Sequence, residues 1–296
     1  MKKRLFSILL VFAMLVSVLT ACDEPQKNDE SEEMWSSFDL NGEQTGYVVA
    51  EARNGSGDRG WVTSAKIPST YKDKPVVGIG NLAFLDCYNL ESVTIPESVM
   101  SIGNNAFGGC DSLTSIVVSD QSPYYASING NLYSKDKKTL VQYAVGKKDT
   151  FFSIPENVTS IGDYAFSSCN SLTNIIIPEG VTSIGNSAFS NCRALTSITI
   201  PEGVTSIGDS VFLYCSNLAD VIIPRSMMSI GNAALYQCDS LNTVYYGGME
   251  SEWNKILIDD LNSGLDSATI YYYSETEPAE SGNYWHYDAD GNPVAW

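Results

Sequence analysis

Apolar positions recur every 23 residues through the middle of the chain, and a single copy shows the pattern. Residues 158–178 have the sequence VTSIGDYAFSSCNSLTNIIIP. Four small or apolar residues of this copy fall at i, i+1, i+4 and i+7: Ala165, Phe166, Cys169 and Leu172. This spacing places them on one side of a helix, so the sequence predicts a short helical segment with that side turned inward.

The second half of the copy changes to a period of two. Ile175 and Ile177 alternate with Asn174 and Ile176, which predicts a strand with one face inward. Pro178 ends this strand, because proline has no N–H to donate to a ladder. Each copy therefore predicts one strand and one short helical turn.

A cysteine stands at the same place in six copies: Cys87, Cys110, Cys169, Cys192, Cys215 and Cys238. Four of the five intervals are 23 residues, and the fifth is 59 because an insertion follows Cys110. A fixed period in this range is typical of a solenoid, in which each turn buries its apolar side against its neighbours. We therefore predict a β-rich repeat solenoid with a cap at each end.

A glycine followed by asparagine or aspartate precedes each expected helical segment, as in Gly162-Asp163. Asparagine and aspartate are good N-cap residues, so we expect their side chains to accept N–H groups of the helical turn. The glycines predict a tight bend that allows positive φ.

The repeated phrase VTSIGDYAFSSCNSLTNIIIPEG resembles the consensus of BspA-type leucine-rich repeats, from about Ile67 to Tyr246. The resemblance implies a right-handed leucine-rich solenoid, with strands on the concave face and short helical or irregular segments opposite. It also implies binding at the cell surface, including adhesion to host or matrix proteins. It brings no catalytic residues and no cofactor.

Residues 119–154 resemble the longer repeat that this family often contains. The segment NGNLYSKDKKTLVQY within it looks like a hairpin. Asn129-Gly130 is a strong turn signal between branched or aromatic residues.

The solenoid is expected over residues 67–247, between an N-terminal cap at 35–66 and a C-terminal cap with an aromatic tail at 248–296. Within the first cap, Tyr47-Val48-Val49 predicts an edge strand. Within the second, Trp253, Ile256 and Leu257 predict a short amphipathic helix that closes the stack.

The first residues predict export. Three basic residues precede an apolar run from Leu5 to Leu19, and Leu19-Thr20-Ala21-Cys22 resembles the lipobox of bacterial lipoproteins. The resemblance implies a signal peptide over residues 1–21 and a lipidated Cys22. An ordinary signal peptide with a chance cysteine is the alternative, and the shortness of the apolar run disfavours a transmembrane helix.

The negative charge of the chain limits the kinds of molecule that it is expected to bind. Residues 22–34 are acidic and polar, which predicts a flexible tether between the lipid anchor and the solenoid. The whole chain has a net charge of −18, and removal of the leader leaves 14 basic and 35 acidic residues. This charge repels phosphate backbones and anionic headgroups, so we expect no nucleic acid partner and membrane contact through the lipid anchor alone.

The six repeated thiols have three interpretations. A ladder of free, buried thiols is favoured, because each cysteine shares the inward side of its copy. Stacking could also bring neighbouring cysteines within disulfide range. A metal site is disfavoured, since no two of these cysteines are close in sequence and the chain has one histidine.

Other candidate chemistry is sparse. The single histidine, His286, lies between Trp285 and Tyr287, which predicts a packed or partly exposed aromatic patch. The sequence DADGN at 288–292 opens like a calcium loop but lacks the distal glutamate, so a turn is favoured over a calcium site. An enzyme that uses surface carboxylates stays a remote alternative.

The outward positions of the predicted strands are the candidate binding residues. One outward column is β-branched or aromatic: Thr94, Val117, Ile176, Thr199, Ile222 and Tyr245. Good strand formers would give the same column without any function. The sharper hypothesis is a recognition surface with an apolar centre.

These observations predict a non-catalytic protein, lipid-anchored on the outer face of a bacterial membrane, that binds an extracellular protein or glycan through its strands. A structural or assembly role in the bacterium's own envelope is the alternative.

Overall fold

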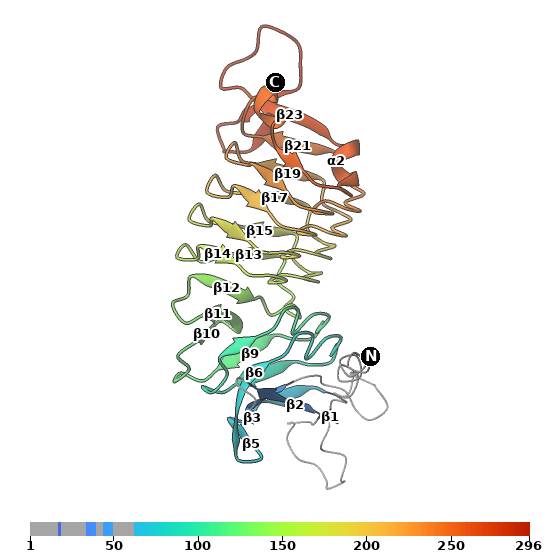
Figure 1. The fold of residues 1–296 in the computed structure, drawn as a ribbon. Helices are drawn as coiled ribbons and strands as arrows, with labels where there is room; N and C mark the ends of the chain where they lie inside the picture. Colours follow the sequence, from blue (N-terminus) through green and yellow to red (C-terminus); the bar gives the residue numbers. More distant parts are fainter. Residues whose placement is uncertain (1–16, 19–33, 40–43, 50–61) are drawn as a thin grey trace, which may run out of the picture.

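A computed structural model describes residues 17–18, 34–39, 44–49 and 62–296, and its turns stack along one axis into a solenoid (Figure 1). From β13 onward, most turns contribute one strand to each of two largely parallel sheets. The predicted β-rich repeat solenoid is confirmed. Most of the leader, Cys22 and most of the tether lie outside the described residues.

The longer strands form an eight-stranded sheet, whose outer surface we name the strand face. Its members are β13 (Phe151–Ser153), β15 (Asn174–Ile176), β17 (Ser197–Thr199), β19 (Asp220–Ile223), β21 (Thr243–Tyr246), β23 (Thr269–Tyr273), β24 (Tyr284–Tyr287) and β25 (Pro293–Ala295). The repeats pair in register, as in Asn174 with Ser197 and Ser197 with Asp220. Side chains at one repeat position therefore form a column along the axis.

The shorter strands form a second eight-stranded sheet. Its members are β10 (Tyr125–Ile128), β11 (Asn131–Ser134), β12 (Thr139–Gln142), β14 (Ser160–Ile161), β16 (Ser183–Ile184), β18 (Ser206–Ile207), β20 (Ser229–Ile230) and β22 (Leu257–Ile258). Here each repeat contributes its Ser-Ile pair, whose isoleucine points into the core in β14, β16, β18 and β20.

The N-terminal turns form separate sheets. A three-stranded sheet contains β4 (Ser64–Lys66), β7 (Ser92–Ile95) and β9 (Ser115–Val118). A six-stranded sheet contains β1 (Ser17–Val18), β2 (Met34–Asp39), β3 (Gln44–Val49), β5 (Thr70–Tyr71), β6 (Lys74–Ile79) and β8 (Ser101–Ile102). The expectation of an edge strand at Tyr47-Val48-Val49 is wrong, because β3 pairs with β2 on one side and β6 on the other.

The long repeat is an antiparallel meander of β10, β11 and β12. Asn129 and Gly130 both have positive φ, 50° and 77°, and connect β10 to β11. The predicted hairpin is confirmed. The meander also separates β9 from β13, so the three-stranded sheet and the strand face are not continuous.

The segment after each glycine is a run of overlapping turns, where a short helix was expected. In one copy, Ala165 N–H donates to Gly162 O and Cys169 N–H donates to Phe166 O. The alternate N–H groups point along the axis instead, as Phe166 N–H does to Ala188 O at 2.7 Å. Non-glycine residues with positive φ recur here, among them Tyr164 and Ser168 at 57° and 67°. A helix is not formed because half of the amides bond to the next turn.

The expected N-cap residues have a different partner. Asp163 Oδ1 accepts the backbone N–H of Asn186 in the next turn at 2.8 Å, and Asn186 Oδ1 accepts that of Asp209 at 2.8 Å. Asn81 and Asp209 make the same bond to the turns that follow them. These side chains cap the next repeat and not their own, so they form an axial ladder.

The glycines leave room for this ladder. Gly162, Gly185 and Gly208 do not have the positive φ that the sequence allowed. A Cβ on Gly208 would collide with Asn186 Oδ1, and one on Gly185 would collide with Asp163 Oδ1. Glycine is required here by the close approach of the neighbouring turn.

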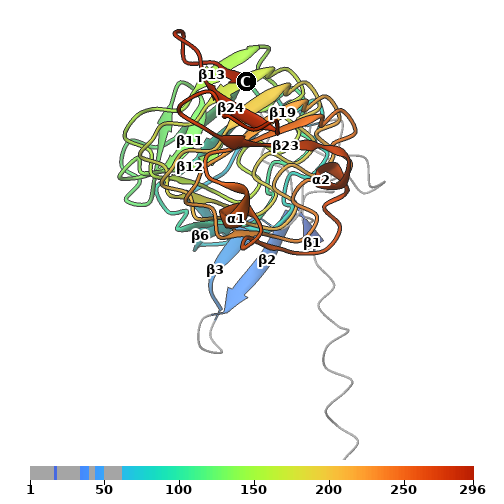
Figure 2. The same cartoon turned by 90° about the horizontal axis from the view of Figure 1, so that it is seen from above.

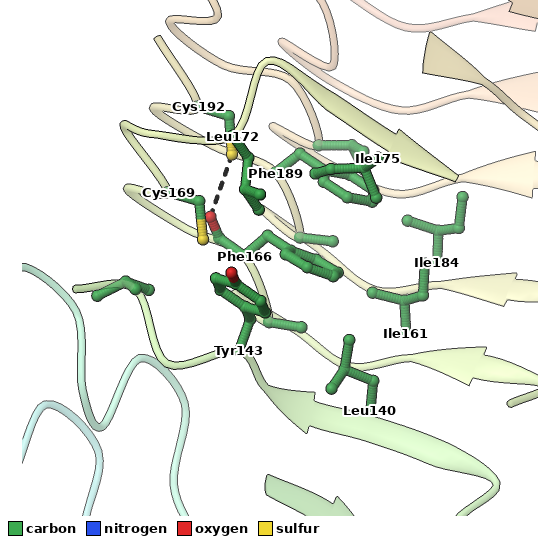
Figure 3. Packing of buried hydrophobic residues seen from close by; sticks show 14 of the residues in the cluster. Leu140, Tyr143, Ile161, Phe166, Cys169, Leu172, Ile175, Ile184, Phe189 and Cys192 are labelled. Atoms are coloured by element: carbon green, nitrogen blue, oxygen red, sulfur yellow. Dashed lines mark hydrogen bonds between the residues drawn. The ribbon is translucent and has the colours of Figure 1, made fainter. Parts of the chain in front are cut away.

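The core is a set of stacked columns (Figure 3). Phe166 and Phe189 stack with ring centroids 5.1 Å apart and planes 11° apart, and Phe189 stacks on Phe212 at 5.4 Å. Beside them, Cys192 Sγ donates to Phe166 O at 3.1 Å. All six repeated cysteines are buried and free, so the interpretation as a buried thiol ladder is confirmed.

The structural repeat continues beyond the residues in which the 23-residue sequence pattern can still be recognised. The predicted closing helix is partly wrong: α1 spans Glu250–Trp253, but Leu257 lies in β22 and its side chain is exposed. Helix α2 (Ser263–Ser267) then leads into β23. Residues 249–273 thus add a further turn to both sheets. Within the described part of the chain, no helix is long and apolar enough to cross a bilayer.

Substitution of Gly208 by alanine should destabilise the solenoid by about 1–3 kcal/mol, because the new Cβ displaces Asn186 Oδ1 from Asp209 N–H. Gly180→Ala is the matched control, since its Cβ would lie 3.6 Å from Glu156 O, an ordinary contact. Urea unfolding measures both. Equal stability of the two variants would contradict the close-approach argument.

The thiol ladder should make the protein sensitive to alkali. Burial raises the pKa of the Cys110, Cys192 and Cys238 thiols, and the neighbouring Cys192 thiol together with burial raises that of Cys215. Their contribution to stability is present below the ordinary thiol pKa of about 8.5. It is lost above that pH, because only the unfolded chain releases these protons.

Each of these four thiols should therefore lower the free energy of unfolding by about 1.4 kcal/mol per pH unit above pH ~8.5. Denaturant melts between about pH 8.5 and 10 measure this slope. The control is Cys192→Ala, which should cost stability at neutral pH yet give a shallower alkaline slope. An unchanged slope in that variant would rule out the thiols as the cause.

Candidate binding site on the strand face

The six candidate residues point outward but lie on two sheets. Thr94 and Val117 pair with each other on the three-stranded sheet. Ile176, Thr199, Ile222 and Tyr245 occupy one column of the strand face, where Ile222 pairs with both Thr199 and Tyr245. The inward residues between the outward positions are buried. The structure therefore brings four of the six candidates together.

The aromatic tail is a β-hairpin. β24 pairs with β23 in parallel, Tyr273 with Trp285, and β25 then returns antiparallel to β24. The turn between them is fixed by Asp288, whose carboxylate accepts the N–H groups of Asp290 at 2.9 Å and Asn292 at 2.8 Å. These donors lower the pKa of Asp288. The predicted turn at 288–292 is confirmed.

Trp285 is the centre of an aromatic cluster. Its ring lies 5.3 Å from Tyr245, 5.3 Å from Tyr273 and 4.9 Å from Tyr287, and 1% of its surface is exposed. Its Nε1–H donates to Tyr246 O at 2.8 Å. This cluster attaches the hairpin to the C-terminal end of the strand face.

His286 lies on the opposite side of β24. Its ring stacks on Trp296 with centroids 3.8 Å apart, and its Nδ1 lies 2.9 Å from Tyr287 O. The predicted aromatic patch is confirmed.

The hairpin and the strand face enclose a groove of about 590 Å³. We name it the hairpin groove. Its floor contains Ile176, Thr199, Ile222 and Tyr245, and its wall contains the hairpin residues Tyr287, Gly291, Asn292 and Pro293. A smaller depression of about 170 Å³ shares Thr199, Ile222 and Tyr287 with it and reaches Trp285. Seen along the axis, the terminal hairpin lies on the side of the strand face (Figure 2).

The charged groups that line the two depressions are carboxylates: Glu179, Glu202 and Asp220, among the residues that the structure describes. Burial raises the pKa of Tyr287, and the charges of Glu202 and Glu179 raise it further. Burial and the charge of Asp220 likewise raise the pKa of Tyr245. The two tyrosine rings therefore lie in a negative field.

The described carboxyl groups with a shifted pKa are not among the residues that line the groove. These groups are Asp136, Glu252 and Asp288, and the pKa of each is lowered by the hydrogen bonds it accepts. No group of three or more metal-ligating side chains is placed together in the described part of the chain.

Sequence reasoning missed the hairpin side of the site. Tyr273, Trp285 and Tyr287 were assigned to a cap or a tail, with no expectation that they reach the strand face. A local signal exists, since two short aromatic or apolar runs flank the DADGN turn, as in a β-hairpin. Its packing site depends on contacts with β15 to β21, about 40 to 110 residues away in sequence.

The fold defines a leucine-rich repeat solenoid whose strand face carries the hairpin groove. Comparison with known families also gives the leucine-rich repeat class, and it identifies one family within that class. The profile of the BspA-type leucine-rich repeat region matches residues 62–139 and 145–256, in six copies. The chain belongs to the BspA-type leucine-rich repeat family.

Solved structures share the fold. The pneumococcal vaccine antigen PcpA matches with a TM-score of 0.56 and 20% identity, over 77% of this chain and 66% of that chain. A leucine-rich repeat protein from Eubacterium ventriosum gives 0.51 and 19%, over 78% and 81%. This chain thus spans just under two thirds of the PcpA chain. A search of curated proteins gave no match.

Proposed function

We propose that the protein is a non-catalytic binding protein of the bacterial cell surface, and that an extracellular protein or glycan docks in the hairpin groove. The observation that carries the proposal is the groove itself, which unites four outward strand residues with a wall from the chain's end. Its volume of about 590 Å³ lies in the range of ~300–1,000 Å³ found for ligand sites.

Exposure of apolar groups supports this use of the strand face. Ile176 exposes 47% of its surface at the β15 end of the groove floor, in the same column as the β-branched residues Thr199 and Ile222. Burial of such a side chain by a ligand is favourable by about 25 cal/mol per Å². Membership of the BspA-type family favours binding over catalysis.

The proposal includes export and attachment to the outer face of a membrane. The basic, apolar and small-residue pattern that ends at Cys22 supports a lipoprotein leader. A lipid chain at Cys22 and the acidic segment up to residue 34 would hold the solenoid away from the bilayer.

Ile176→Asp should weaken ligand binding at least about tenfold, because a charge replaces an apolar contact in the groove floor. The purified protein is tested on arrays of matrix proteins, glycans and fractionated bacterial envelope. The envelope fraction distinguishes a self partner from a host partner.

Val117→Asp is the matched control for Ile176→Asp. Val117 is 45% exposed and occupies the equivalent outward position on the separate three-stranded sheet. Thermal unfolding should change little in either variant. Binding that survives Ile176→Asp, or falls equally with Val117→Asp, would show that the ligand site is elsewhere.

Cys22→Ala should abolish incorporation of radiolabelled palmitate and release the protein from the membrane fraction, because the other six cysteines are buried in the solenoid. Cys110→Ala is the control and should keep the label, since Cys110 is buried in the solenoid. Unchanged labelling of the Cys22 variant would contradict lipidation at this residue.

A further inference from the structure

The described charged groups that line the hairpin groove are all of one sign. Its described charged lining consists of carboxylates, Glu179 and Asp220 in the main groove and Glu202 in the smaller depression. Arg225, in the turn after Glu202, is already paired with Glu252 at 2.6 Å. The groove therefore offers negative charge to a ligand.

Two aromatic rings border these charges. Tyr287 is 46% exposed and lies in the field of Glu179 and Glu202, while Tyr245 lies in that of Asp220. An accessible ring face next to a carboxylate attracts a cation through both the ring quadrupole and the charge. The pairing of Tyr287 with Glu179, and of Tyr245 with Asp220, gives the groove two positions of this kind.

Glu202 has another role. Its carboxylate accepts the backbone N–H groups of Arg225 at 3.2 Å and Ser226 at 3.3 Å. Since these bonds fix its orientation within the turn, Glu179 and Asp220 are the carboxylates left for a ligand.

The length of the groove indicates the kind of cation. Its floor runs from β15 to β21, which is three strand spacings, or roughly 14 Å at ~4.8 Å per spacing. An extended peptide of about four residues covers this distance. Its apolar side chains would cover Ile176 and Ile222, which a small cation would leave exposed.

On the basis of the proposed binding function, we propose that the hairpin groove receives a basic segment of a partner protein, whose arginine or lysine side chains lie against Tyr245 and Tyr287 and pair with Asp220 and Glu179. The net charge of −18 would steer such a segment toward the protein.

The test uses a synthetic peptide in which pairs of arginines alternate with pairs of valines, so that both residue types lie on each face of the extended chain, and the same peptide with citrulline in place of arginine. Citrulline keeps the shape and the hydrogen-bonding plane but removes the charge. Titration calorimetry with the full chain should show binding of the arginine peptide, weaker at high salt, and at least about tenfold weaker binding of the citrulline peptide.

Variants locate the binding. The pair Asp220→Asn and Glu179→Gln should weaken the arginine peptide about tenfold, and Tyr287→Leu should weaken it as well. The matched control is Asp111→Asn with Glu156→Gln, which removes the same charge from exposed positions outside the groove. A circular dichroism melt verifies that each variant is folded.

The inference is overturned if the two peptides bind equally, if neither binds at millimolar concentration, or if the control pair reduces binding as much as the groove pair. The protein could bind a glycan or matrix protein on the arrays in a way that depends on Ile176, and yet not bind the arginine peptide. This result would support the proposed function and reject the basic segment as the ligand. Failure of both arrays and peptides would reject both.

Discussion

The axial hydrogen bonds between turns are the interaction on which the rest of the structure depends. Within the turn segment, alternate N–H groups bond to the following turn, and the side chains of Asn81, Asp163, Asn186 and Asp209 cap the backbone of the next one. These bonds fit only if successive turns have the same length, and this requirement explains the strict period of 23. It also explains glycine before the ladder residue, since a Cβ at Gly208 would occupy the place of Asn186 Oδ1.

Strict register has a second consequence, in the core. Because each position stacks on its copy, the core consists of columns of one residue type, such as the phenylalanines at 5.1–5.5 Å spacing. Cysteine fits its column because it is small and its thiol satisfies a carbonyl of the preceding turn, as Cys192 does with Phe166 O. The raised thiol pKa values keep these sulfurs protonated, so residues that look reactive in the sequence act as packing groups.

Whatever depends on the period could be predicted from the sequence, and whatever depends on contacts between distant segments could not. The alternation that buries Ile175 and exposes Ile176 follows from one strand, and the Asn129-Gly130 hairpin follows from two residues. The helix expected after Gly162 was wrong because the positions on one side of a helix are also those that a run of turns directs inward. Local spacing does not reveal that half of the amides bond to the next turn. The hairpin wall of the groove was missed because its partners are strands encoded far upstream.

For the proposed binding function, the two breaks in the repeat determine which part of the strand face a ligand can use. The long repeat separates Thr94 and Val117 from the strand face, so an extended ligand cannot follow the outward column along the whole solenoid. At the other end, the chain folds back over β15 to β21 and adds Tyr287 and Pro293 to a surface that would otherwise be an open, shallow sheet. A uniform array of turns offers the same weak contacts at every position and therefore no preferred site. The irregular hairpin makes one stretch of the strand face different from the others. This stretch gains a wall and aromatic rings, which lie beside the carboxylates of the groove. Specific binding in a repeat protein of this kind therefore depends on the residues that depart from the repeat.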